Sequence, residues 1–484
     1  MNEEQIYQKL VKICGSKFVS SEQEILESYS TDLSYVKGFN PQFVVWVNNT
    51  KQIEKILKLA NIVGFSVVPI SSSSPIRYHG DTIPLRDNSI ILDLSRMNRV
   101  LNIDRKNRVI MVEPGVSFGQ VIPILRNKDL RLLLPLQPRD GKSVLTTALE
   151  RVPTTIPRYQ WDSSDPLLCT EVVFGTGDLF RTGTAAGPGT IKQQQKTGQA
   201  QVNPMGPTQF SPFRVIQGAQ GSLGVVTWAT LKLELLPAIQ KVIHLQSENI
   251  LDLLRLQHGL LKYRLGDEIL FLNNLNLACL LRLMPKDIEE LSNSLANWNL
   301  IFILSGRGEL ASEKIKYQEG DINDIVGNLN LDHLKKKSDI EENEILEALN
   351  SSTSYPWRNR LKGSFQDIFF ITNYEKISDF ITLAETEIPR DLGIYIQAIN
   401  QGTSYHCEFD IYYDIEDEES VNKKFMDLSI KFMDNGAFFN RPYGVWANEV
   451  FKKHEQSTHK ALKKVKKIFD PNNVLNPGVL GFDY

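Results

Sequence analysis

The chain has 484 residues, of which 42% are hydrophobic and 23% are charged, so it can bury a sizeable core and is expected to form two domains rather than one. Its net charge is only −3, and lysines are interspersed with acidic residues, which argues against nucleic acid or an anionic membrane surface as the main partner. Residues 1–5 lack the basic start of a signal peptide and no apolar run approaches a membrane span, so we expect a cytoplasmic protein.

The first part of the chain alternates between predicted strands and helices. After a helical lead-in and connector (1–40), a helix is predicted over 50–63, because apolar residues recur at helical spacing and Gly64 closes the segment. A second helix is predicted from Phe118 onward, after a Pro114-Gly115 turn. The strands expected around these helices are residues 43–47, 65–69, 89–94 and 109–112.

A run of four serines, Ser71–Ser74, follows the second of these strands. Small polar residues leave successive backbone amides uncrowded and add hydroxyl donors, so a turn of this kind can bind an anion such as a diphosphate. The alternative interpretation is an ordinary solvated turn.

The later part of the chain predicts a long surface loop and then a mixed layer of helices and strands. Residues 184–212 are rich in Gly, Gln, Thr and Pro and are expected to form the loop. Residues 238 to about 435 predict an α+β arrangement with strands at 301–304, 368–371 and 394–398. The four cysteines show none of the paired spacings of zinc or iron–sulfur sites, so packed thiols and no metal site are expected; they are Cys14, Cys169, Cys279 and Cys407.

Two later segments carry candidate site residues. In residues 403–414 a strand-like alternation places His406, Glu408 and Asp410 on one face, either as a solvent-facing sheet edge or as a row of polar groups at a pocket. In residues 438–446 dense aromatics surround Arg441, which suits a pocket wall with one anion-binding guanidinium. An interdomain salt bridge is the other interpretation of Arg441.

Five segments, in this order, resemble the vanillyl-alcohol oxidase superfamily, which also holds p-cresol methylhydroxylase and the flavin-linked D-lactate and glycolate dehydrogenases. They are residues 67–84 (VVPISSSSPIRYHGDTIP), 91–121, 169–183, 218–227 and 470–478. The resemblance implies an α+β fold, with a two-subdomain FAD-binding domain (41–237) and a cap domain carrying a large antiparallel sheet (238–437). It also implies that residues 438–484 return to the FAD domain.

The resemblance implies FAD as the cofactor and assigns residues to it. Those expected to bind FAD are Pro69, Ser71, Ser72, Ser73, Ser74, Tyr78, His79, Gly80, Pro114, Gly115, Thr146, Thr147, Gly221, Gly224, Val225 and Asn476. His406 stands close to where the family carries a flavin-linking histidine, so a covalent link through His406 is an alternative to noncovalent FAD, which is favoured.

The resemblance also suggests catalytic residues, with departures from each branch of the family. Arg441 falls where phenol-oxidising members hold a phenolate, but Asn440 replaces the tyrosine that usually precedes it. In the D-lactate and glycolate branch a Glu-His-Gly stands where this chain has Pro442-Tyr443-Gly444, so a metal-assisted hydroxy-acid site is hard to build. The residues predicted to be catalytic are Arg441, Asp162, Tyr443 and His406, and those predicted to bind substrate are Arg441, Tyr443, Trp446, Glu408 and Trp161.

Asp162 is predicted because an Ala-x-Glu-Arg element at 148–151 and an aspartate before residue 170 resemble the phenol oxidases, where such an aspartate lies near the flavin nitrogen that accepts hydride. Asp165 is the rival position, and either aspartate can instead cap a turn.

The expected function is that of an FAD-dependent oxidoreductase that takes a hydride from a C–H next to an oxygen-bearing or aromatic centre, such as a para-substituted phenol or benzylic alcohol. One alternative is a D-2-hydroxy-acid dehydrogenase that passes electrons to an electron-transfer flavoprotein, cytochrome or quinone. The other is a flavin-free binding or structural relative, which the missing glycines at Ser71–Ser74 favour. A homo-oligomer, such as a homodimer, is expected.

Overall fold

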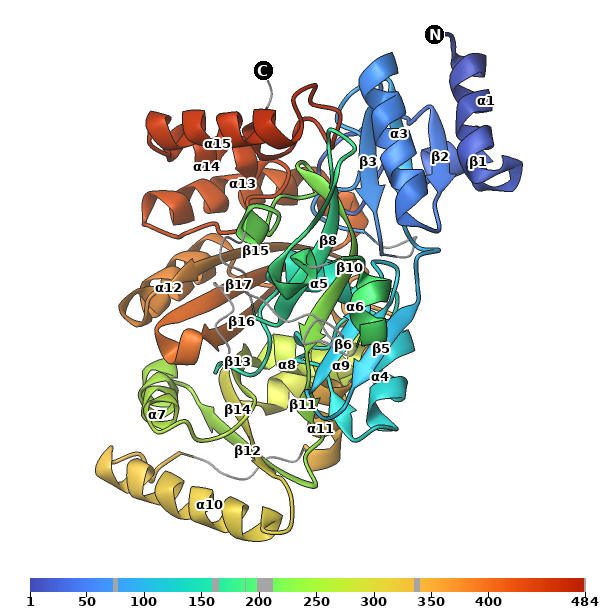
Figure 1. Cartoon of the computed structure of the whole chain (residues 1–484). Coiled ribbons are helices and arrows are strands. Elements are labelled where there is room, and N and C mark those ends of the chain that lie inside the picture. Colours follow the sequence, from blue (N-terminus) through green and yellow to red (C-terminus); the bar gives the residue numbers. More distant parts are fainter. Residues whose placement is uncertain (73–76, 159–164, 188, 198–211, 335–339, 483–484) are drawn as a thin grey trace.

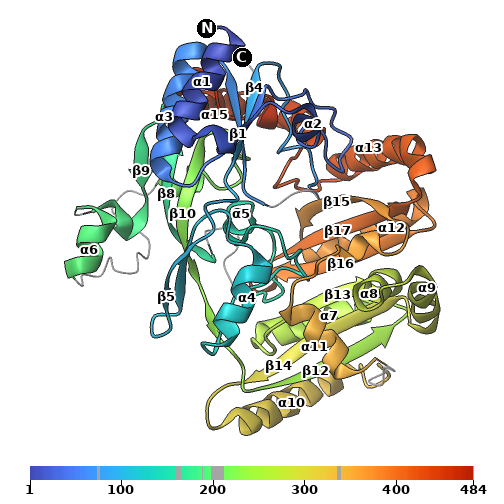
Figure 2. The same ribbon diagram turned by 90° about the vertical axis from the view of Figure 1, so that its right-hand side faces the viewer.

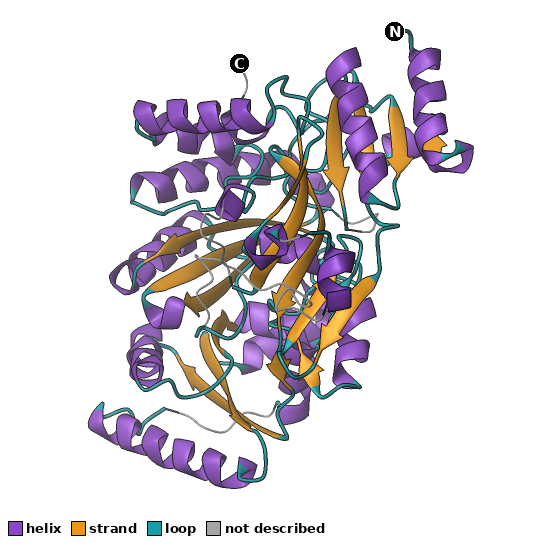
Figure 3. Cartoon of the chain, viewed as in Figure 1, coloured by secondary structure: helices purple, strands orange, loops and turns teal. Residues whose placement is uncertain are grey.

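The computed structural model describes residues 1–72, 77–158, 165–187, 189–197, 212–334 and 340–482. Three main sheets and the helices packed on them make up an α+β fold, as predicted (Figure 1; Figure 3). Both chain ends lie at the same end of the molecule, above the first sheet and the last helices.

The first sheet has four strands in the order β1-β2-β4-β3. β2 and β3 each pair with β4 in parallel, whereas β1 pairs with β2 antiparallel, so the lead-in also supplies an edge strand. The Asn49 side chain accepts from the Gln52 amide and Gly64 ends α3 in the left-handed conformation, which explains the helix bounds. The elements of this region are α1 (Glu3–Cys14), β1 (Val19–Ser20), α2 (Gln23–Glu27), β2 (Phe43–Trp46), α3 (Thr50–Val63), β3 (Ser66–Ile70) and β4 (Ser89–Asp93).

The second sheet has five antiparallel strands in the order β5-β6-β10-β8-β9. Its apolar face packs on α4 and α5, and a two-stranded ribbon of β7 and β11 lies at its end. The elements are β5 (Val100–Asp104), β6 (Val109–Val112), α4 (Phe118–Arg126), β7 (Leu130–Arg131), α5 (Val144–Leu149), β8 (Leu167–Phe174), β9 (Leu179–Arg181), α6 (Ile191–Thr197), β10 (Gly224–Lys232) and β11 (Glu234–Leu235).

The third sheet has six strands in the order β12-β14-β13-β16-β17-β15, and every neighbouring pair is antiparallel where the register is given (Figure 2). The large antiparallel sheet predicted for this region is therefore confirmed. The strands are β12 (Ile239–Ser247), β13 (Ile269–Asn273), β14 (Trp298–Gly306), β15 (Ser364–Thr372), β16 (Leu392–Ile399) and β17 (Ser404–Tyr413).

Helices cover this six-stranded sheet on both faces. One face packs on α7 (Ile250–Lys262), α10 (Ala311–Asn328), α12 (Ile377–Glu387) and α13 (Glu418–Asp434). The other face packs on α8 (Asn274–Leu281), α9 (Pro285–Ser294) and α11 (Glu342–Asn350), and its remaining part faces the first two sheets.

The last segment returns to the first sheet. Beyond α14 (Trp446–Lys453) and α15 (Gln456–Phe469), the Asn476 amide donates to the Val67 carbonyl at 2.9 Å, and Leu475 bridges to Val67 in parallel. The fully buried Lys466 ammonium donates to the carboxylate of Asp470 at 2.5 Å, which anchors α15 to this segment.

Two expectations differ from the structure. The interpretation of 403–414 as a solvent-facing edge is wrong, because β17 lies between β16 and β15 and its side chains from Tyr405 to Tyr413 are buried. The surface loop expected at 184–212 contains the helix α6, which projects from the side of the molecule opposite the six-stranded sheet (Figure 2). Within the described ranges, no helix has both the length and the apolar character needed to cross a membrane.

Candidate functional site

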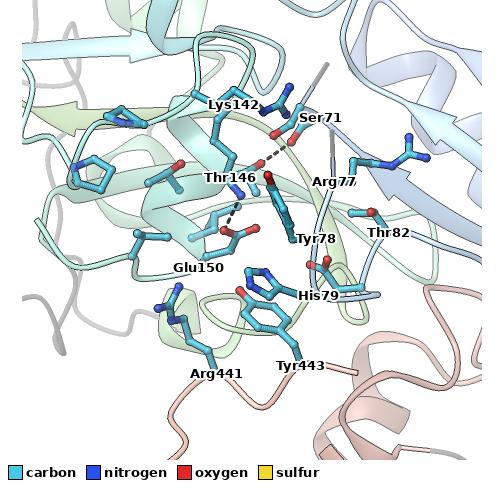
Figure 4. Close-up of a pocket in the computed structure, with 18 of the residues that line it drawn as sticks. Ser71, Arg77, Tyr78, His79, Thr82, Lys142, Thr146, Glu150, Arg441 and Tyr443 are labelled. Atoms are coloured by element: carbon cyan, nitrogen blue, oxygen red, sulfur yellow. Dashed lines mark hydrogen bonds and ion pairs between the residues drawn. The ribbon is translucent and has the colours of Figure 1, made fainter. Parts of the chain in front are cut away.

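A large pocket lies where the first two sheets face the six-stranded sheet. Its wall includes the C-terminal end of β3, the helix α5, the start of β10, the facing strands β15 to β17, and Arg441 and Tyr443. Figure 4 shows part of this wall. The structure brings most of the predicted cofactor residues to this wall, namely Pro69, Ser71, Ser72, Tyr78, His79, Pro114, Thr146, Thr147, Gly221, Gly224 and Val225. It also brings His406, Glu408, Arg441 and Tyr443 to the wall.

At one end of the pocket, which we name the cofactor end, hydroxyl groups connect β3 to α5. The hydroxyl of Ser71 hydrogen-bonds to that of Thr146, as Figure 4 shows. The Ser72 hydroxyl accepts from the Ser143 amide at 3.0 Å, and the Ser143 hydroxyl in turn accepts from the Thr146 amide at 3.1 Å as the N-cap of α5. This end therefore offers neutral hydroxyl groups to a ligand.

The main chain also approaches closely at the cofactor end. Gly221 has φ of +69°, and a Cβ there would stand 2.6 Å from Cγ of Pro69, so only glycine fits between β3 and the 218–224 loop. Such a cradle of closely spaced backbone and hydroxyls fits the diphosphate of FAD. The residues that would hold FAD here are Pro69, Ser71, Ser72, Thr146, Gly221 and Val225.

Several predicted residues do not lie on this wall. Gly80 donates from its amide to Asp32, Gly115 donates to the Met97 carbonyl, and the Asn476 side chain donates to the carbonyls of Asp81 and Gln220. These three therefore shape or join the loops around the pocket. Ser73, Ser74, Trp161 and Asp162 lie outside the described residues.

Beyond the cofactor end, towards the opposite end of the pocket, charged side chains enter the pocket. The Lys142 ammonium lies 2.8 Å from the Glu150 carboxylate (Figure 4). Burial, together with the nearby carboxylate of Glu150, raises the pKa of Asp81 to about 7. Asp81 is therefore a carboxyl group that titrates near neutral pH inside the pocket.

Arg441 lies at the opposite end, which we name the substrate end. Its side chain is 7% exposed, its guanidinium carbon stands 4.2 Å from the centre of the Phe369 ring, and its Nε has no hydrogen-bond partner. Tyr443 is also buried, and burial raises the pKa of its phenol well above the ordinary value. A buried guanidinium N–H without a partner beside aromatic rings is suited to bind an anionic oxygen.

A charged cluster supports the substrate end from β17. Arg358 ion-pairs with Glu408 and donates from Nε to Asp410 at 3.0 Å. Burial alone would raise the pKa of Glu408, but Arg358 and His406 lower it to about 2, whereas burial raises the pKa of Asp410. The guanidinium of Arg358 thus contacts two buried carboxyl groups whose pKa values are shifted in opposite directions.

His406 is held within this cluster. Its Nε2 lies 3.2 Å from the Glu408 carboxylate, and its buried Nδ1 has no partner. Burial lowers the pKa of the imidazole, which favours its neutral form.

Trp446 does not reach the pocket. Its indole N–H donates to the Ser429 hydroxyl at 3.0 Å, and its ring packs behind Phe369 at a centroid distance of 5.1 Å. The predicted role of Trp446 in substrate binding is therefore corrected to support of Phe369 from the core.

The sequence interpretation missed several pocket residues. Arg358 and Asp367 were not singled out, although Asp367 alternates with Phe365 and Phe369 along β15 and so faces the same side. That alternation was a usable signal for Asp367, whereas Arg358 lies in a single 3₁₀ turn (Trp357–Asn359), which gives no periodic pattern. Other pocket residues outside the prediction are Arg77, Asp81, Arg139, Lys142, Glu150 and Tyr395.

The described residues contain no group of three or more His, Cys, Asp or Glu side chains placed to bind a metal ion. All four cysteines are free and buried.

A family model identifies a flavin-binding domain in the chain. The family model described as FAD binding domain matches residues 41–183, and FAD is the cofactor that this domain binds. Two curated relatives are each 26% identical to the chain: the mitochondrial D-lactate dehydrogenase [cytochrome] of Arabidopsis thaliana over 205 residues, and the 4-cresol dehydrogenase [hydroxylating] flavoprotein subunit of Pseudomonas putida over 187 residues. These matches cover 42% and 38% of this chain but only 32% and 35% of the relatives.

Similarity of fold covers the whole chain, whereas each of these two sequence matches covers less than half of it. A crystal structure of p-cresol methylhydroxylase with substrate bound superposes with a TM-score of 0.83 at 19% identity, covering 99% of this chain and 97% of that one. The chain therefore shares the fold of p-cresol methylhydroxylase over its whole length, and its residues 41–183 match the FAD binding domain model.

Proposed function

We propose that this protein is an FAD-dependent oxidoreductase that takes a hydride from a C–H next to an oxygen-bearing or aromatic centre, such as that of a para-substituted phenol or benzylic alcohol, and that the substrate carries an anionic oxygen. The observation that supports this most directly is the Arg441 guanidinium, which is buried at the substrate end with Nε unpartnered and packed over Phe369. A charged donor is costly to bury unless an anion completes its hydrogen bonds, so this geometry favours an anionic substrate oxygen.

The chain's residues position the substrate and exclude water. Arg441 would bind the oxygen anion, and the rings of Phe369, Tyr395 and Tyr443 would form the apolar wall around the substrate. When bound, FAD supplies the hydride acceptor. Arg358 would keep Glu408 ionised beneath the substrate, and the neutral His406 would offer an uncharged nitrogen to the pocket.

A D-2-hydroxy acid is the second candidate substrate. The relative named D-lactate dehydrogenase supports it, and a guanidinium can bind a carboxylate through two hydrogen bonds. For either substrate, electrons would leave the reduced cofactor for oxygen or for an electron-transfer protein or quinone, and a homo-oligomer remains part of the proposal.

The experiment begins with a visible spectrum of purified protein supplied with FAD. The proposal fails in its first step if no flavin spectrum develops, which is the outcome for a flavin-free relative. The holoprotein is then mixed anaerobically with para-alkylphenols, benzylic alcohols and D-2-hydroxy acids, and bleaching of the flavin absorption identifies the substrate class. Acid precipitation separates the two modes of attachment, since noncovalent FAD stays in the supernatant and a link through His406 leaves it in the pellet.

A further inference from the structure

His79 makes a hydrogen bond across the pocket to Asp367, and this contact has no part in the proposed binding of the substrate anion. Its Nε2 lies 3.2 Å from both carboxylate oxygens of Asp367 on β15. Its ring stacks on Tyr443, with a centroid distance of 4.8 Å and an interplanar angle of 13°. Figure 4 shows the imidazole beside the Tyr443 ring, with Arg441 next to them.

The imidazole is held in this position by a strained main chain. His79 has φ of +75°, a conformation that residues with a side chain rarely adopt. The Gly80 that follows also has φ of +75°, and a Cβ there would stand 2.4 Å from Cγ2 of Val36. On the other side, a Cβ on Gly444 would stand 2.9 Å from the His79 carbonyl. Residues 36, 79–80 and 444 thus pack closely around the main chain that carries the imidazole.

The partner of His79 decides which ring nitrogen carries the proton. A carboxylate accepts hydrogen bonds, so Asp367 fixes the neutral tautomer with hydrogen on Nε2. Nδ1 then has a free lone pair, and it makes no hydrogen bond within the described part of the chain. An Asp–His pair with one bare nitrogen in a pocket has the arrangement of a general base and the group that orients it.

The surroundings set the charge of His79. Burial by itself lowers the pKa of the imidazole, but Asp367, with a contribution from Asp81, raises it above the ordinary value, while Arg441 opposes that rise. The other titratable groups that face the ring are the phenols of Tyr78 and Tyr443. The imidazole therefore accepts a proton readily, as a base working near neutral pH requires.

We propose that His79, oriented by Asp367, takes the hydroxyl proton of a substrate whose oxidised carbon carries an OH group. This inference rests on the proposed function and narrows its substrate class to alcohols, with Arg441 binding a separate anionic oxygen. The O–H bond breaks and its proton goes to Nδ1 of His79. The C–H bond breaks with its electron pair, FAD is the two-electron oxidant, and the carbon–oxygen bond becomes a carbonyl.

The kinetic test compares His79→Gln, His79→Ala, Asp367→Asn and Asp81→Asn holoenzymes in anaerobic flavin reduction by the best alcohol. Loss of the base should lower the rate about 10²- to 10⁴-fold in both His79 variants, and added imidazole should restore part of the rate in His79→Ala. In wild type the rate should rise with pH through the His79 titration. In Asp367→Asn that midpoint should move to lower pH, because the carboxylate that raises it is gone. In Asp81→Asn the pH midpoint of the rate should also move to lower pH, but by less than in Asp367→Asn, because Asp81 makes the smaller contribution to the pKa of His79.

A second measurement needs no turnover. Histidine labelled with ¹³C in the ring should show a resonance that is absent from His79→Gln and titrates above the ordinary histidine range in the FAD-loaded protein, and at lower pH in Asp367→Asn. A purely structural salt bridge would lower thermal stability in these variants without changing the pH midpoint of the rate, and that result would overturn the inference. Reduction of wild type by alkylphenols but by no alcohol would also overturn it while leaving the proposed function intact, whereas no reduction by any substrate would remove both.

Discussion

The two ends of the pocket differ in the chemical groups that line them. The cofactor end consists of hydroxyl groups and close main-chain contacts from Ser71, Ser72, Thr146 and Gly221. The substrate end consists of charged side chains, in which Arg358 and Arg441 lie among buried carboxylates and aromatic rings. Neutral groups can bind a diphosphate without depending on pH, whereas buried charges make the substrate end selective and dependent on each partner.

The comparison predicts its largest effect at the Arg358 cluster. Arg358→Ala would leave Glu408 and Asp410 buried without their guanidinium, so the free energy of unfolding should fall by about 3–5 kcal/mol. Urea denaturation of the FAD-saturated protein measures this. The matched control is Arg282→Ala, which removes a more exposed ion pair with Glu344 and should cost less than about 1 kcal/mol. Equal losses in the two variants would mean that the cluster is not held as a buried unit.

Removal of the Arg441 charge should mainly affect catalysis. Arg441→Ala should lower kcat/KM for the best substrate. The corresponding loss of transition-state stabilisation should be about 2–5 kcal/mol, because a charged hydrogen bond in a buried site is lost. Arg441→Lys keeps the charge but not the planar fork, and so should retain part of the activity. An unchanged kcat/KM in Arg441→Ala would show that the anion binds elsewhere.

The difference between the ends also explains what the sequence could predict. The cofactor end follows from local patterns, since Ser71 and Ser72 come directly after a strand and Gly221 lies in a short glycine-rich stretch. The first strands and α3 were predicted from periodicity and turn residues for the same reason, whereas the large antiparallel sheet was implied by the resemblance to a known family. Resemblance to a known family supplied the pairing of these pieces with FAD.

The substrate end depends on contacts between segments far apart in the chain. His79 meets Asp367 across 288 residues. Arg358 reaches Glu408 and Asp410 from a single 3₁₀ turn, which is too short to show a periodic pattern. Trp446 was predicted to line the pocket because it belongs to the dense group of aromatic residues around Arg441. Its indole N–H instead donates to Ser429 in the core. Spacing along the chain carries no information about which of two adjacent aromatics faces a cavity formed by another domain.

Asp81, which lies between the two ends of the pocket, is expected to make the stability of the folded protein depend on pH. Its folded-state pKa of about 7 lies above the ordinary value of 3.8, so the folded protein holds this proton more tightly than the unfolded chain. The stability that this group contributes is present at low pH and is lost as pH rises from about 4 to 7. Asp81→Asn cannot ionise, so its melting temperature relative to wild type should increase between pH 5 and pH 8. The exposed Asp178→Asn is the control, and a constant difference for Asp81→Asn across this range would contradict the prediction.

The smallest effect is expected at the cofactor end, where single neutral hydrogen bonds are exchanged. Ser72→Ala removes the hydroxyl that accepts from the Ser143 amide at 3.0 Å, which should weaken FAD binding by about 0.5–1.5 kcal/mol, or roughly 2- to 12-fold in Kd. Quenching of flavin fluorescence during titration of apoprotein measures this affinity, with Ser294→Ala on the exposed side of α9 as the control. Because the serine hydroxyl is neutral, the substitution removes no charged contact to the diphosphate, and the loss should be the same at low and high salt. A salt-dependent loss would instead show that charged side chains reach the diphosphate, and the two ends would then differ less than their contacts indicate.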